Sequence, residues 1–262
     1  MASIRDAVDE CIRERNSLLK FFVFAIPLFL CTQAILSGMK PDSGMLLIGC
    51  ILTSVLLLGY MIKITLNVAD ESSTIVLPNL NIIVIFLIGL KGALVLAPVA
   101  LISKILGALC IGLLANAPLP PQLTVVFSWI IGIIFGSFVY TSYLMYTRRG
   151  KVFDAFNVSA IFKYCVDILI AVFFMKILIA IIDIILILPI GYLLWLFLGI
   201  QNPVSIMFLC CVVVFNISLM GHYFAQIGYE IIAVDEEEKA EDLKYAQMEK
   251  ERLEKLKNNN FE

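Results

Sequence analysis

The sequence predicts an all-α, polytopic integral membrane protein with six transmembrane helices, two of them overlong or broken, and short amphipathic interfacial helices. Of its 262 residues, 61% are hydrophobic and only 15% are charged, and the mean hydropathy is +0.98. Apolar stretches of about 20 residues recur, which is the length of helix that crosses the hydrocarbon core of a bilayer. Lysine and arginine are concentrated in alternate connections between these stretches, as expected for connections that face the cytoplasm.

The apolar stretches predict helices and exclude a membrane barrel. Residues 82–102 and 168–188 are apolar on nearly all sides and are interrupted only by isolated ionisable residues. A barrel strand would instead alternate polar and apolar residues over about 10 positions. Lipid offers no hydrogen bonds to the backbone, so segments without that alternation must cross it as helices.

Residues 1–17 predict a short amphipathic helix that lies on the membrane surface. Ile4, Ala7 and Cys11 recur at helical spacing, and charged residues occupy the other face. A frayed amphipathic start is the alternative interpretation. The first apolar run begins near Leu18 and lacks a convincing small-residue cleavage site, so we expect an uncleaved first span rather than a signal peptide.

Residues 18–234 are expected to form the transmembrane domain. Basic residues in short connections and near span ends set its orientation. A basic anchor follows the fourth span, whereas the opposite side has only Lys40 and Lys104. This distribution fits six spans in a cell (inner) membrane, with both termini in the cytoplasm. The expected spans are 18–38, 44–68, 80–104, 122–146, 164–189 and 204–234, and the inner-face basic anchor is Arg148, Arg149, Lys151 and Lys163.

Two apolar runs, 82–115 and 165–200, are too long for one perpendicular crossing. Each would measure roughly 50 Å as a continuous helix. Each also contains a proline, Pro98 or Pro189, where helices tend to kink or break. Two crossings in the first run would place Arg148 outside, so we expect one crossing with a broken, re-entrant or interfacial extension. A strongly tilted long helix is the alternative.

Two segments at the expected inner face are candidates for contacts outside the bilayer. Residues 152–163 alternate apolar with polar side chains and predict a short amphipathic helix at the inner leaflet. Residues 235–262 are dense in Glu and Lys and predict a charged cytoplasmic tail. The tail fits a solvated extension of the last helix, and a docking helix for a partner is the alternative.

Ionisable residues at bilayer depth are the candidate functional residues. Each costs about 2.5–3.5 kcal/mol on insertion scales and therefore needs a partner, a cavity or an escape route. Lys176 and Asp183 project from one helix face, and Lys91 is a candidate interhelical partner of Asp183. The cluster lines an ion or substrate path in one interpretation, and forms structural pairs or snorkels in the other. It comprises Lys91, Lys104, Asp167, Lys176, Asp183 and His222, with Glu230 near the end of the last span.

No motif predicts an enzyme, a cofactor or a metal site. His222 is the only histidine, and with no cysteine or carboxylate cluster nearby it is expected to hydrogen-bond Gln226 or a neighbouring helix. Phosphate-binding loops, HExxH and dinucleotide glycine patterns are missing, and no basic stripe suggests nucleic acid. The seven cysteines form no CxxC pair, and only Cys110 is expected in an external connection. The pairs Gly89–Ala93 and Gly132–Gly136 have the spacing that lets helices pack closely.

Five segments occur in an order that is similar to a known family. They are GYMIKITLNVADESS (59–73), LPNLN (77–81), GLKGALVLAP (89–98), YTRRGKVFDAFNVSAIFKY (146–164) and GHYFAQIGYE (221–230). Over about 18–234 the chain resembles a polytopic prokaryotic membrane family known only as domain of unknown function 4013. The charged tail and the Ser- and Thr-rich turn at 68–76 depart from the family pattern. The family has no assigned activity, so the resemblance implies topology and no catalytic residue.

These features favour a non-enzymatic subunit or scaffold of an inner-membrane assembly. Its outer connections are short and nearly uncharged, so a protein partner is expected at the cytoplasmic face or within the membrane, and a homo-oligomer stays open. The lipid bilayer is the expected surrounding of its apolar spans. The alternative is a small-solute or ion transporter or channel, since broken helices and intramembrane charges occur where substrates cross.

Overall fold

The computed structural model describes residues 4–40, 43–70, 75–115, 120–149, 151–199 and 201–233, and in these ranges the chain is helical and contains no strand. Six of its helices are long and apolar enough to cross a membrane, which confirms the predicted class. The α-helices are α1 (Ile4–Arg13), α2 (Ser17–Leu36), α3 (Gly44–Ala69), α4 (Ile82–Ala115), α5 (Pro121–Arg149), α6 (Val158–Ile182), α7 (Leu188–Leu198) and α8 (Pro203–Ile227). Three short helical segments accompany them: η1 (Val152–Phe156), η2 (Asp183–Ile187) and η3 (Gly228–Ala233).

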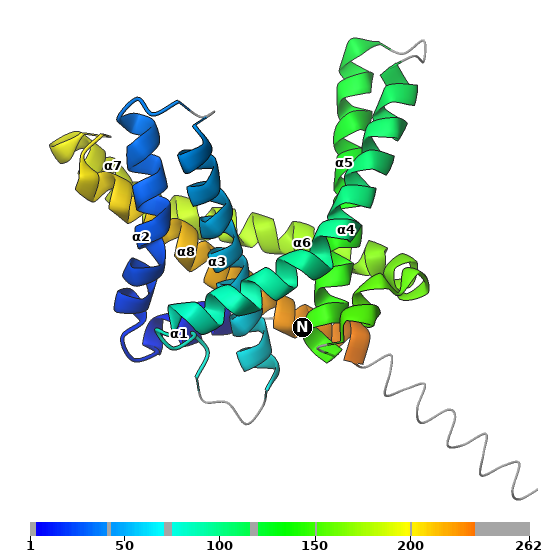
Figure 1. Ribbon diagram of the computed structural model, residues 1–262, viewed down its shortest axis with the longest axis horizontal. Helices are drawn as coiled ribbons and strands as arrows, with labels where there is room; N and C mark the ends of the chain where they lie inside the picture. Colours follow the sequence, from blue (N-terminus) through cyan, green and yellow to red (C-terminus); the bar gives the residue numbers. More distant parts are fainter. Residues whose placement is uncertain are drawn as a thin grey trace, which may run out of the picture.

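The first overlong run is a single helix. The expected connection at 105–121 is mostly helical, because α4 continues to Ala115 and α5 begins at Pro121. Lipid offers the backbone no other hydrogen-bond partner, so the apolar run beyond Lys104 stays helical. Cys110, expected in an external connection, therefore lies within α4. Figure 1 shows α4 changing direction along its length, and Pro98 within it is a residue that bends helices.

The second overlong run is helical throughout but locally distorted. Between α6 and α7, residues Asp183–Ile187 form a π-helical turn, and Pro189 follows at the start of α7. Proline has no amide hydrogen to donate, and its ring clashes with the carbonyl four residues earlier. A π turn is one way for a helix to absorb such a defect. The expected connection at 190–203 shrinks accordingly, because α7 extends to Leu198.

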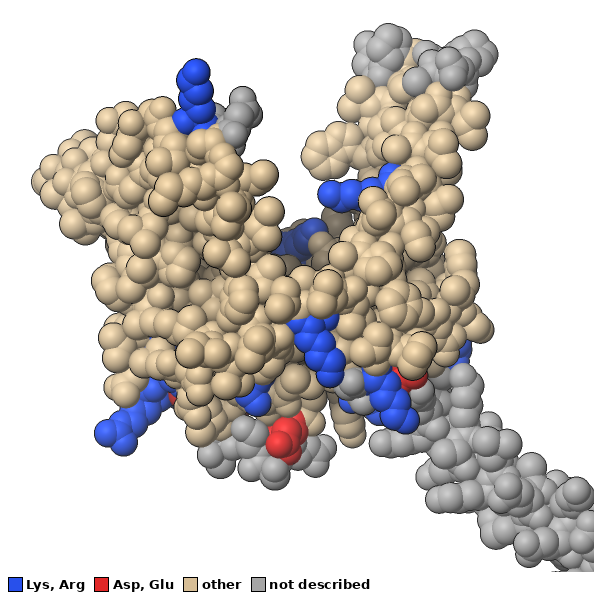
Figure 2. Space-filling view, in the orientation of Figure 1, with Lys and Arg blue, Asp and Glu red and all other residues tan. Residues whose placement is uncertain are grey.

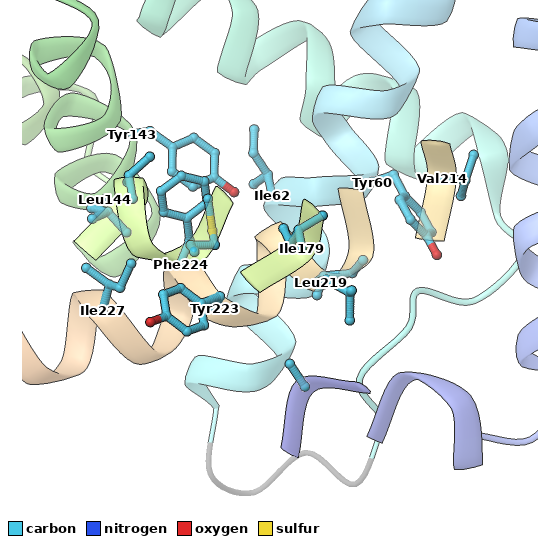
Figure 3. Packing of buried hydrophobic residues seen from close by; sticks show 14 of the residues in the cluster. Tyr60, Ile62, Tyr143, Leu144, Ile179, Val214, Leu219, Tyr223, Phe224 and Ile227 are labelled. Atoms are coloured by element: carbon cyan, nitrogen blue, oxygen red, sulfur yellow. The ribbon is translucent and has the colours of Figure 1, made fainter. Parts of the chain in front are cut away.

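Helix α8 is the centre of the molecule. It packs against α2 and α3 along its length and against α1 near its end. Its buried side chains include Val214, Leu219 and Phe224, all 0% exposed. Figure 3 shows Phe224 beside Tyr143 of α5, with ring centroids 5.3 Å apart. These contacts join the spans into one apolar core.

Buried hydroxyl groups add polar links between the spans. The Thr65 hydroxyl of α3 donates to the carbonyl of Gly221 in α8 at 2.9 Å. The Tyr143 hydroxyl of α5 lies 2.7 Å from the same Thr65 hydroxyl. The Tyr60 hydroxyl lies 3.1 Å from that of Ser218. In lipid such interhelical hydrogen bonds supply specificity that apolar packing alone lacks.

Helices α3 and α4 cross at a pair of glycines. A Cβ atom on Gly59 would lie 2.0 Å from the Ile85 carbonyl oxygen, and one on Gly89 would lie 1.9 Å from that of Val55. No real side chain tolerates such distances, so the crossing depends on glycine at both positions. Gly89 therefore serves the close packing predicted for it. Gly132 and Gly136 do not, since an added Cβ would meet nothing within 4 Å.

The molecule is open on one side rather than a closed bundle. The later part of α4 and α5 form an upright hairpin, which we call the α4–α5 arm, and it stands apart from α2 and α3 (Figure 1). Figure 2 shows a hollow between this arm and the opposite side, with lysine or arginine side chains on its walls. Of the most apolar 18 residues of α5, only 6% are buried, against 22–39% in the other five spans.

The two predicted amphipathic segments have different outcomes. A helix forms at the N-terminus, and Ala7 and Cys11 are buried against the protein rather than left open to lipid. The segment 152–163 is not one helix, because η1 ends at Phe156 and Asn157 caps the start of α6 by accepting a hydrogen bond from the Ala160 amide. The predicted tail, 235–262, lies outside the described residues.

Candidate functional site

The ionisable residues predicted within the membrane do not gather into one cluster. No hydrogen bond or ion pair joins any two of them in the described ranges. Four lie exposed on helix surfaces, one is half-buried and one is buried. In that order they are Lys91 and Lys104 on α4, Asp167 and Lys176 on α6, Asp183 at the start of η2 and His222 on α8.

Asp183 is paired with an amide and not with a lysine. The Asn216 Nδ2 atom donates to both carboxylate oxygens, at 2.9 and 3.2 Å. The suggested interhelical pair of Lys91 with Asp183 is not formed within the described part of the chain, and neither is a pair with Lys176. Because Asn216 belongs to α8, its contact ties the π-helical turn to the central helix.

Lys176 lies over an aromatic ring. Its Nζ atom is 5.4 Å from the centroid of the Tyr140 ring on α5, which is cation–π geometry. The Tyr140 ring also stacks on Phe224, with centroids 5.7 Å apart. The lysine therefore has an aromatic neighbour, but no described carboxylate neutralises it.

A cavity of about 680 Å³ lies between α5 and α6 at this lysine. We call it the α5–α6 cavity. Its α5 wall runs from Ser128 and Trp129 past Gly132 and Gly136 to Tyr140, and Lys176 is the one charged side chain among its described lining residues. The volume is typical of pockets that bind small molecules. An aromatic, mostly apolar wall with one cation can hold an apolar molecule that carries a negative charge.

His222 has two partners, one of them predicted. Its Nδ1 atom lies 3.2 Å from the Gln226 amide nitrogen one turn on, as the sequence suggested. Its Nε2 atom lies 2.7 Å from the Glu10 carboxylate of α1. An imidazole protonated at Nε2 satisfies both contacts, because it donates to Glu10 and accepts from Gln226. His222 thus anchors the N-terminal helix to the end of α8.

A buried ion pair fixes the N-terminal helix a second time. The Lys20 ammonium pairs with the Glu14 carboxylate, and the two side chains are only 10% and 12% exposed. Lys20 also donates to the Leu77 carbonyl at 2.9 Å, and Glu14 accepts from the amides of Val76 at 3.0 Å and of Leu77. We call this group the Glu14 clamp. It joins the turn that follows α1 to α2 and to the connection before α4.

The sequence did not reveal the Glu14 clamp, although one signal was present. Glu14 continues the spacing of Ala7 and Cys11 one step past the end of α1 at Arg13, and this places it on the side of the chain that packs against the protein. Lys20 is a basic residue at the start of the first expected span, and it is only 8% exposed within α2. Glu10 is an acidic residue of α1, and its partner His222 is more than 200 residues away along the chain.

The basic anchor lies around the end of α5. Arg148 and Arg149 are the last residues of α5, Lys151 precedes η1, and Lys163 lies in α6. The Lys163 ammonium is 4.8 Å from the centroid of the Tyr164 ring. In Figure 2 most of the visible lysine and arginine side chains lie along the edge that holds α1 and the end of α5.

No group of three or more His, Cys, Asp or Glu residues is placed to hold a metal ion among the residues that the structure describes. All seven cysteines are free. Searches with models of known families, among curated proteins and among solved structures find no match for this chain.

Proposed function

We propose that this chain is a non-enzymatic subunit or scaffold of a membrane assembly, and that the α4–α5 arm binds its partner. The observation that carries the proposal is the low burial of α5, of whose most apolar 18 residues only 6% are buried. Lipid can also cover such a surface, so low burial alone does not distinguish lipid from a protein partner. A charge on the same arm argues for protein.

That charge is Lys104, which is exposed on α4 and has no ion pair or hydrogen bond with a described residue. It precedes the end of α4 at Ala115 by three helical turns, or about 17 Å. Snorkelling to the outer interface over that distance is beyond the reach of a lysine stem. A carboxylate on a partner helix at the same depth would neutralise the ammonium group and remove most of its insertion cost.

Partner contacts at the inner face are part of the same proposal. The basic anchor at the end of α5 and the docked helix α1 lie toward one edge of the molecule (Figure 2). The positive-inside rule makes this edge cytoplasmic in a cell (inner) membrane, with both termini there. The charged tail, 235–262, would then reach a cytoplasmic partner. Membership of the family of unknown function 4013 is likewise proposed, on the five sequence segments that resemble it.

Site-specific photo-crosslinking in native membranes tests the proposal. A photoreactive amino acid at Leu101 or Val126, both exposed on the arm, should capture one protein of defined mass. The same residue at Leu196 of α7, equally exposed, is the matched control and should capture only lipid. Lys104→Met should abolish the crosslinked band, and Lys40→Met should leave it unchanged. Lipid adducts alone at Leu101 and Val126 would overturn the proposal.

A transporter or channel is the second candidate, because the α5–α6 cavity and the π-helical turn at Asp183 are features of helices that line substrate paths. Neutralising Lys176 and Asp183 together separates the two functions. Lost partner binding with unchanged solute flux in proteoliposomes argues against transport. Lost flux with an intact assembly argues against the scaffold.

A further inference from the structure

We propose that the α5–α6 cavity is a binding site for a long-chain carboxylate, a fatty-acid-like molecule with one negative charge and one acyl chain. The proposal goes beyond the subunit function and holds for a scaffold or a transporter alike. It is carried by the shape of the cavity, by the glycines in its wall and by the single lysine at one end.

The shape of the cavity fits one extended chain. On α5 its lining runs from Ser128 to Tyr140, a rise of about 18 Å along the helix. Gly132 and Gly136 lie between these ends and have no side chain to fill the space, and a Cβ added to either would meet nothing within 4 Å. A mostly apolar space of about 680 Å³ along this wall suits a single acyl chain. A lipid with two chains would need a second groove.

The charge in the cavity selects an anion. Among the described residues that line the cavity, Lys176 is the one with a charged side chain, and it forms no ion pair with a described residue. At bilayer depth an ammonium group is stabilised by a counter-ion, and a monovalent carboxylate matches its charge. The Tyr140 ring already lies 5.4 Å from Nζ. Its hydroxyl forms no hydrogen bond with a described residue, so it is a second donor for the carboxylate.

The position of the lysine favours a fatty acid over a phospholipid. Tyr140 precedes the basic end of α5 at Arg148 by about 12 Å of helix. A phospholipid headgroup lies at the level of the basic anchor, whereas a small carboxylate can follow its chain further into the protein. The chain would extend from Lys176 toward Trp129.

Trp129 makes the site measurable, because the chain has only two tryptophans. In a Trp195→Phe variant reconstituted in neutral lipid, dibromostearate at low mole fraction should quench Trp129 fluorescence in a saturable manner. Lys176→Met should raise the half-saturating concentration at least tenfold, and Lys176→Arg should restore it to near the original value. The brominated long-chain alcohol, which lacks the charge, should quench only weakly and without saturation.

A cavity-filling variant gives an independent test of the same site. Gly136→Leu places a side chain where an added Cβ meets nothing within 4 Å, so it should fill the groove and abolish saturable quenching without perturbing the fold. Gly112→Leu on α4 is the control and should bind as before. The Trp129→Phe protein, which keeps Trp195, should show no saturable quenching.

Two results would overturn the proposal. Saturable quenching by brominated phosphatidylglycerol but not by dibromostearate would assign the cavity to a phospholipid. Equal, unsaturable quenching in the original, Lys176→Met and Gly136→Leu proteins would show that the cavity holds only bulk lipid.

Discussion

Glu14 is the residue on which the docking of α1 depends most. Its carboxylate pairs with buried Lys20 and accepts from two backbone amides. Removing one partner of a buried ion pair typically costs 3–5 kcal/mol, because the other charge stays buried without compensation. By contrast, the Arg13–Asp9 pair of the same helix has side chains 80% and 45% exposed. Such surface pairs contribute about 0–1 kcal/mol.

We therefore expect Glu14→Gln to release α1, with Cys11 as the reporter. Cys11 is 0% exposed in the docked helix and should react slowly with maleimide. In a protein that keeps only this cysteine, Glu14→Gln should raise the rate of modification at least tenfold. Asp9→Asn is the matched control and should change the rate by less than twofold. Equal rates in the three proteins would contradict the assigned role of the Glu14 clamp.

The same thiol predicts how the docking of α1 depends on pH. Burial, with smaller contributions from Glu14 and Glu10, raises the pKa of Cys11 from 9.0 to about 12. A raised pKa stabilises the docked state below pH 9, and this stabilisation is lost as pH rises from 9 toward 12. Proteolysis at Arg13 or Arg15 should therefore accelerate above pH 9. Cys11→Ala should remove that acceleration, and a rate that stays flat to pH 10.5 in the original protein would argue against it.

Among the elements, the crossing of α3 and α4 is the most sensitive to substitution. A methyl group at Gly59 or Gly89 would collide with backbone, which cannot rotate away. Gly59→Ala and Gly89→Ala should each lower the stability of the detergent-solubilised protein by about 1–3 kcal/mol or more. Gly112→Ala on α4 meets nothing within 4 Å and should be neutral or slightly stabilising. Thermal unfolding of the three variants measures the difference, and a melting temperature for Gly59→Ala equal to that of Gly112→Ala would contradict the crossing.

The elements also show what the sequence could predict. The length of the apolar runs predicted the spans, because lipid stabilises an apolar helix wherever it occurs in the chain. It misplaced their ends near Ala115 and Leu198, since an apolar run carries no signal for where the membrane stops. The pairs Glu10–His222 and Asp183–Asn216 depend on helices that meet in space. Nothing in local periodicity encodes such a meeting, so the candidate site was predicted residue by residue but not as contacts.

For the whole molecule, the arrangement of the spans combines a firm core with an open arm. The core around α8 is held by apolar packing and by the hydroxyl links of Thr65 and Tyr60. The α4–α5 arm lacks such burial along α5. The lower end of the arm is tied by the Ser142 hydroxyl, which donates to the Ala155 carbonyl of η1. An arm fixed at one end and open along its length is suited to holding a partner.

We predict the orientation of this molecule in the membrane from the distribution of its charges. The end of α5 carries the basic anchor, and Lys40 is the only basic residue described in the connection between α2 and α3. Moving several cations across a membrane is unfavourable at each residue, so the anchor should stay in the cytoplasm. In a cysteine-free background, Lys40→Cys should react with an impermeant maleimide on intact cells. Lys151→Cys should react only after the membrane is permeabilised. Labelling of Lys151→Cys on intact cells would reverse the topology, and with it the assignment of the Glu14 clamp and the charged tail to the cytoplasmic side.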